Sequence, residues 1–134
     1  MWLFTRHGYF SICQKPGEKQ LTIRARVRAD LENLRVQYLP KIKIIERAGT
    51  DYQFRAKVSH KQFANAVKKM VLEIGYENFT EEVAGKQGMR RSMVYHRVWS
   101  VLTGLEREDG RGMGLQGEDS EGCFPDTWDG FESS

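Results

Sequence analysis

Residues 20–28 carry side chains of the types that bind anions. Strand side chains alternate between two faces, so a strand here would place Arg24, Arg26 and Arg28 together. Neighbouring guanidinium groups on that face would be about 7 Å apart and would repel by roughly 0.6 kcal/mol per pair in bulk water. The spacing therefore predicts an anionic partner opposite this face. With side chains expected on neighbouring strands, the candidate anion-binding or partner-binding residues are Arg24, Arg26, Arg28, Lys43, Arg55, Lys57 and Tyr9.

A second motif, Thr5-Arg6-His7-Gly8, has residue types used in phosphoryl transfer. It matches the start of the histidine phosphatase motif, in which the arginine holds a phosphate group and the histidine attacks it. A phosphatase of that kind needs a larger α/β sheet and a second arginine and histidine in its pocket. Gly8 instead runs directly into the strand-like residues 9–12. We interpret the match as a coincidence, and we expect a polar bend between β segments and no enzyme activity.

The sequence contains no pattern that predicts a metal or a cofactor. His7, His60 and His96 lie in three separate segments and lack the short helical spacings of zinc ligands. The glycine repeat at residues 110–114 follows no expected strand and opens no expected helix, so it fails as a phosphate loop. We therefore expect no metal site and no cofactor.

The basic face supports two interpretations of function. Sheets of the RNA-recognition class bind single-stranded nucleic acid on an open face through aromatic and basic side chains. On the expected register only Tyr9 supplies an outward aromatic ring, and no RNP-like motif is present. We favour the alternative, a non-enzymatic protein-interaction or structural module that buries these side chains against its own helices or a second copy. An enzyme of another kind is the third alternative.

The elements that must position these residues begin with two strand-like segments, residues 2–5 and 9–14, and residues 6–8 between them form either a tight turn or a bend in one long strand. The alternation of apolar residues favours one long strand bent at Gly8. The residues expected to face inward on it are Trp2, Phe4, Phe10 and Ile12. The turn Lys15-Pro16-Gly17-Glu18 predicts a hairpin with the strand of residues 20–28. Residues 41–47 and 52–58 predict two further strands, and the inward residues of the second are Tyr52, Phe54, Ala56 and Val58.

Helical spacing of apolar residues follows in three segments. Residues 30–38 predict a short helix with Asp30 as its N-cap. Ser59 and Gln62 form a capping box that opens an amphipathic helix closed by Gly75. A less regular helical stretch begins at Thr80 and improves over residues 89–105, where the apolar line consists of Val94, Val98, Val101 and Leu105.

The order strand, strand, helix, strand, strand, helix is typical of an α+β fold. A right-handed crossover leaves room for the strand of residues 52–58 beside that of residues 20–28. The expected order across the sheet is the N-terminal strand, then residues 20–28, 52–58 and 41–47. We predict a ferredoxin-like or permuted ferredoxin-like sandwich, with a mainly antiparallel four-stranded sheet, helices on one face and an extra C-terminal helix.

Charge is distributed unevenly along the 134 residues. Residues 106–134 have nine acidic and two basic side chains, a net charge of −7, whereas residues 1–105 have nineteen basic and nine acidic, a net charge of +10. We expect a compact α+β domain over residues 1–105 and a disordered, Gly/Ser-rich acidic tail over residues 106–134. We favour a tail that only increases solubility; the alternative is that residues 126–132, which mix acids with aromatic rings, contact the basic face and weaken anion binding.

Several short stretches resemble a widespread group of small bacterial proteins of unknown function. They are Met1-Trp2-Leu3-Phe4-Thr5, Gly8-Tyr9-Phe10-Ser11, Leu21-Thr22-Ile23-Arg24-Ala25-Arg26, Asp51-Tyr52, Tyr76-Glu77-Asn78-Phe79 and Tyr95-His96-Arg97-Val98-Trp99. The resemblance covers residues 1–105 and implies a compact bacterial domain, and it assigns no catalytic or binding residue.

Two further patterns predict the compartment. The first residues lack the pattern of a signal peptide, and no apolar run approaches the about 18 residues of a membrane span. Cys13 and Cys123 have no disulfide-framework spacing and are expected to be reduced thiols. We therefore expect a cytoplasmic protein whose partner is another protein or a second copy, with nucleic acid as the alternative and no membrane.

Overall fold

The computed structural model describes residues 1–46 and 51–111. Within these residues five strands form one antiparallel sheet in the order β1-β2-β3-β5-β4. The strands are β1 (Trp2–Thr5), β2 (Gly8–Cys13), β3 (Leu21–Ala25), β4 (Ile45–Glu46) and β5 (Phe54–Val58). The predicted α+β class and the predicted order of the segments across the sheet are confirmed, with five strands in place of four.

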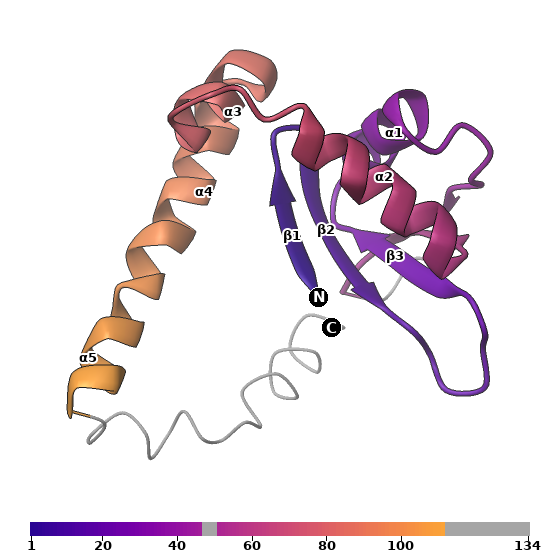
Figure 1. The fold of residues 1–134 in the computed structure, drawn as a ribbon, viewed down its shortest axis with the longest axis horizontal. Helices are drawn as coiled ribbons and strands as arrows, with labels where there is room; N and C mark the ends of the chain where they lie inside the picture. The colour runs from indigo at the N-terminus through magenta and orange to yellow at the C-terminus, as the bar shows by residue number, and fades with distance from the viewer. Residues whose placement is uncertain (47–50, 112–134) are drawn as a thin grey trace.

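The helices divide into a layer and an arm. They are α1 (Arg28–Gln37), α2 (His60–Leu72), α3 (Phe79–Gln87), α4 (Met89–Leu102) and α5 (Gly104–Arg111). Figure 1 shows α1 and α2 over the sheet, while α4 and α5 follow one another away from that layer, on the side of β1. We call α4 and α5 together the arm, which continues helical structure past the expected domain boundary at residue 105. None of the described helices is both long enough and apolar enough to cross a bilayer.

The fifth strand arises because the N-terminal segment folds back on itself. Thr5 pairs with Gly8, so Arg6 and His7 form a two-residue turn between β1 and β2. The Thr5 hydroxyl accepts hydrogen bonds from the backbone N–H groups of His7, at 3.0 Å, and Gly8, at 3.1 Å. The expectation of one long bent strand is therefore wrong.

This hairpin reverses the faces expected for the first aromatic residues. Leu3 lies opposite Phe10, whereas Phe4 lies opposite Tyr9 and Trp2 opposite Ser11. Since Phe10 belongs to the core, Trp2 and Phe4 lie on the other face of the sheet. A two-residue turn pairs an odd residue of one strand with an even residue of the next, so the even residues of β1 and β2 lie on opposite faces. The alternation of period 2 within each strand does not indicate this reversal.

The hydrophobic core lies between the sheet and the layer of α1 and α2. β2, β3 and β5 each contribute alternate residues, and the two helices contribute residues spaced by three. The buried cluster consists of Phe10, Ile12, Ile23, Ala25, Leu31, Leu34, Tyr38, Leu39, Ile42, Ala56, Val58, Phe63 and Ala66.

The structure corrects three expected strand positions and one expected helix cap. β3 ends at Ala25, so Arg26 lies in the following bend and Arg28 is the first residue of α1. Val27, in extended conformation, is the N-cap of α1 in place of Asp30. Lys43 is exposed and precedes β4, which has only two residues within the described range. The arginines therefore do not share one strand face.

The start of α2 was predictable in detail. Ser59 Oγ accepts from the backbone N–H of Gln62 at 3.1 Å, and the Gln62 side chain accepts from the backbone N–H of Ser59 at 3.1 Å. This reciprocal capping box satisfies two N–H groups that the first helical turn leaves without partners.

Candidate interaction surfaces

The face of the sheet opposite α1 and α2 combines aromatic, polar and basic side chains, and we call it the open sheet face. The strand pairing assigns to it Trp2, Phe4, Tyr9, Ser11, Cys13, Thr22, Arg24, Arg55 and Lys57. Tyr9 stacks on Phe4 with ring centroids 4.6 Å apart and meets the edge of Trp2 at 6.2 Å. Outward aromatic residues are therefore more numerous than the sequence indicated.

Tyr52 is the centre of the basic part of this face. It precedes β5 and is 3% exposed, but its ring packs on arginines and not in the core expected for it. The guanidinium carbons of Arg24 and Arg26 lie 4.7 Å and 4.4 Å from its centroid, within the range of a cation–π contact. Its hydroxyl contacts that of Tyr9 at 2.9 Å.

Much of the positive charge on this face is matched within the chain. The Arg26 guanidinium donates to the backbone oxygen of Asp51 at 3.0 Å. Arg55 donates to the backbone oxygen of Tyr52 at 3.1 Å and lies 3.9 Å from the Asp51 carboxylate. Lys57 pairs with Glu18 at 2.6 Å. The anionic groups that the arginine spacing predicted are thus partly supplied by neighbouring residues.

The seven residues predicted for this surface do not all meet. Arg24, Arg55, Lys57 and Tyr9 project from adjacent strands of the open sheet face, and Arg26 joins them from the bend after β3. Arg28 instead pairs with Glu32 one turn along α1, at 3.1 Å. Neither Arg28 nor Lys43 belongs to the open sheet face.

Sequence reasoning missed a chain of aromatic rings that leads from the sheet to the helices. Phe4 meets the edge of Tyr95 at 5.3 Å, Tyr95 stacks on Phe79 at 5.8 Å, and Phe79 contacts Tyr76 at 6.1 Å. Three of these rings lie in residues 76–95, for which the sequence pattern predicts only a loop and helices. Their proximity to Phe4 depends on the tertiary packing of α3 and α4, for which the sequence has no local signal.

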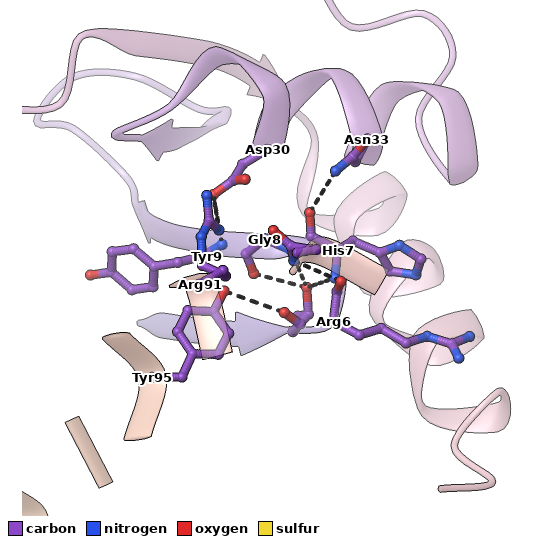
Figure 2. Close-up of polar contacts among 10 residues, drawn as sticks. Arg6, His7, Gly8, Tyr9, Asp30, Asn33, Arg91 and Tyr95 are labelled. Atoms are coloured by element: carbon purple, nitrogen blue, oxygen red, sulfur yellow. Dashed lines mark hydrogen bonds and ion pairs between the residues drawn. The ribbon is translucent and has the colours of Figure 1, made fainter. Parts of the chain in front are cut away.

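The turn that carries the phosphatase-like motif is held by contacts to four other elements. Gln87 donates to the Arg6 oxygen at 2.7 Å, Tyr95 to the Thr5 oxygen at 3.3 Å and Asn33 to the His7 oxygen at 2.9 Å. Figure 2 shows Asn33 and Tyr95 pointing toward this turn from opposite sides. The Arg6 guanidinium is bound by two carboxylates, of Glu82 at 2.7 Å and of Glu73 at 3.4 Å.

Asp30 anchors both the hairpin and the arm. Its carboxylate oxygen accepts from the Tyr9 backbone N–H at 3.0 Å and from Arg91 at 2.9 Å (Figure 2). The Asp30 side chain is only 4% exposed, so the ion pair is largely shielded from water. A side chain at Gly8 would collide with it, since a Cβ there would lie 2.5 Å from the Asp30 carboxyl carbon.

His7, Tyr38 and Glu73 form a hydrogen-bonded relay beside the turn. The Tyr38 hydroxyl donates its one proton to Glu73 at 2.5 Å, so His7 Nε2, at 2.9 Å, must be protonated and donate to Tyr38. Burial, with the positive charges of Arg6 and Lys86, lowers the pKa of His7. Burial and the hydrogen bond to Glu73 raise the pKa of Tyr38 to about 12. The surroundings of the relay therefore favour the neutral form of His7.

A small, mostly apolar cavity of about 130 Å³ adjoins this relay. Its apolar lining comes from β1, the second half of α2 and the segment that follows α2, and Arg6, His7 and Tyr38 line it as well. The polar groups of these three residues already contact one another or carboxylates. Among the described residues, no three histidines, cysteines or carboxylates cluster in a way that could hold a metal ion.

The arm contains seven of the fifteen large apolar residues that are exposed among the described residues. The buried residues of α4 are Ser92 and Tyr95, both in its first half, and Ser92 donates to the Thr80 oxygen at 2.8 Å. Val101 is 76% exposed and Trp99 61%. The exposed large apolar residues of the arm are Met89, Met93, Val94, Trp99, Val101, Leu102 and Leu105.

Comparisons of the chain with protein-family models, with curated proteins and with solved structures find no match. Function must therefore be argued from the geometry of these surfaces.

Proposed function

We propose that this protein is a non-enzymatic interaction module that self-associates through its arm. The observation that carries the proposal is the exposure of Val94, Val101 and Leu105, three residues of the apolar line that the sequence indicated for this segment. Burying one such side chain contributes about 1.5–3 kcal/mol. Exposed large apolar side chains that lie together on one helical face are typical of a surface that a partner covers.

Charge along the arm favours a second, antiparallel copy as that partner. The first part of the arm carries Arg90 and Arg97 without an acidic residue, whereas the sequence of α5 contains Glu106, Glu108 and Asp109 with Arg107 and Arg111, a net charge of −1. An antiparallel pair places each basic part opposite the acidic part of the other copy, while a parallel pair opposes like charges. Complementary charge therefore favours the antiparallel pair of arms over the parallel pair.

Substitution of one exposed residue tests the proposal. Val101→Glu should convert a dimer into a monomer, because it places a charge in the apolar contact while leaving the buried core untouched. Val36→Glu is the matched control, since Val36 is 73% exposed on α1, away from the arm. Light scattering over a concentration series measures the mass. A wild-type monomer at every concentration, or a dimer that survives Val101→Glu, would refute the proposal.

One observation favours a second candidate function, the binding of single-stranded nucleic acid. Trp2 and Phe4 join Tyr9 on the open sheet face, which supplies stacking rings beside Arg24 and Arg26. Base stacking and phosphate contacts together are how such sheets bind single strands.

A salt series distinguishes this second candidate. Binding of a random oligonucleotide should weaken steeply as salt rises, and Arg26→Ala should make the slope shallower by about one unit per lost phosphate contact. Lys61→Ala, which removes the same charge from α2, should leave the slope unchanged. Absence of binding at low salt would exclude this function.

We further propose that β2, β3, β5 and β4, with α1 and α2, form a permuted ferredoxin-like arrangement. The strand order supports this, since the strand that would end a ferredoxin-like chain comes first here. The kinship with the small bacterial proteins and a cytoplasmic location are proposals as well, resting on the sequence patterns alone.

A further inference from the structure

We propose that the acidic segment of residues 126–132 binds the open sheet face of its own chain. The segment lies outside the described residues, and its sequence is Asp-Thr-Trp-Asp-Gly-Phe-Glu. The proposal concerns a different surface from the arm and does not depend on self-association. It makes the tail an internal ligand for the basic and aromatic side chains of the sheet.

The open sheet face contains buried polar atoms that the described residues do not satisfy. Thr22 is 2% exposed and its hydroxyl has no hydrogen-bond partner among them, and the same is true of Arg24 Nε. Both residues project from β3 on this face, next to Arg55 and Lys57 of β5. A buried polar atom without a partner is costly, so a ligand that supplied the missing hydrogen bonds would stabilise this part of the face.

The chemistry of the tail complements this surface. Residues 112–134 contain six acidic and no basic side chains, together with Phe124, Trp128 and Phe131. Carboxylates can pair with guanidinium groups, and aromatic rings can pack beside Trp2, which is 56% exposed and already in edge contact with Tyr9. The tail therefore combines acidic with aromatic side chains, and the open sheet face combines basic with aromatic side chains.

The tail is also long enough to reach the sheet from the tip of the arm. The arm spans residues 89–111, which corresponds to about 35 Å of helix. The 23 residues of 112–134 span up to about 75 Å when extended. A segment near residue 126 can therefore return along the full length of the arm to the sheet.

Two native cysteines report this contact in the full chain. Cys13 belongs to the open sheet face, where it pairs with Thr22, and Cys123 precedes the acidic segment by three residues. Treatment of the reduced, dilute protein with diamide, a thiol oxidant, should yield an intramolecular Cys13–Cys123 disulfide. Mass spectrometry and protection from alkylation measure the rate at which it forms.

Matched charge variants separate docking from random encounter of the chain ends. Asp126→Asn with Asp129→Asn should slow the reaction about tenfold, because docking raises the effective concentration of Cys123 at Cys13. Glu118→Gln with Asp119→Asn removes the same charge outside the acidic segment and should slow it much less. About 1 M NaCl, which shortens the screening length to about 3 Å, should slow the wild-type reaction.

Three results would overturn the proposal. Equal rates for the two paired variants and for high salt would show that the cysteines meet only by random motion of the tail. A disulfide formed mainly between two chains would place the tail on a second copy. An oligonucleotide that binds the open sheet face without slowing the reaction would show that the tail does not occupy that face.

Discussion

At the scale of single residues, the turn of Arg6 and His7 gathers groups from distant parts of the chain. Glu73, Glu82 and Tyr38 all approach it, although they lie at least 31 residues away in sequence. The four-residue motif that suggested phosphate chemistry is engaged in ion pairs and hydrogen bonds that hold the hairpin against the helices. His7 and Arg6 have polar partners of their own in the described structure.

Stability should depend on pH through His7. Its pKa is lowered mainly because burial disfavours the charged ring, while the unfolded value is about 6.5. Below that value the unfolded state binds more protons than the folded state, so the free energy of unfolding should fall as pH drops from about 7.5 to 5.5. The hydrogen bond from Tyr38 lowers the pKa of Glu73. The stability that ionised Glu73 contributes is therefore lost only at a lower pH, as this carboxylate becomes protonated.

Urea unfolding of His7→Gln measures this effect. Glutamine keeps a neutral N–H donor near the position of Nε2 but does not titrate, so the variant should lose less stability over the same pH range. His60→Gln, at an exposed position on α2, is the control and should retain the wild-type pH dependence. The same pH dependence in His7→Gln as in the wild type would show that the histidine does not cause it.

At the scale of elements, two local signals predicted the helices well, whereas the faces of the first strand could not be predicted. The capping box at Ser59 and the helical spacing of residues 89–102 depend on near neighbours, and both match the structure. The reversal at Arg6 and His7 could not be read from alternation, so the faces of Trp2 and Phe4 were assigned wrongly. The aromatic part of the open sheet face was missed for this reason.

The Asp30–Arg91 ion pair should carry much of the attachment between the arm and the sheet. Arg91→Met leaves a carboxylate buried without its cation, and we expect a loss of about 3 kcal/mol in the free energy of unfolding. Asp30→Asn with Arg91→Met should cost less than the sum of the two single changes, with a coupling energy of about 1–3 kcal/mol. Additive losses in urea unfolding would show that the two side chains act independently.

At the scale of the whole molecule, charge and apolar surface are segregated. Residues 1–105 carry a net charge of +10 and residues 106–134 a net charge of −7. This layout was visible in the sequence, because it depends on composition alone. The sequence could not show that the apolar line of the arm lacks a covering element among the described residues, since its spacing equally predicts a buried helix.

Charge reversal across the arm tests antiparallel self-association most directly. Arg97→Glu and Glu106→Arg should each weaken the dimer at low salt, because each opposes like charges between the two copies. An equimolar mixture of the two variants should restore it, since each contact between the mixed chains again joins opposite charges. Analytical ultracentrifugation should find mainly monomer for each variant alone and dimer for the mixture. A mixture no more dimeric than its components would contradict the account.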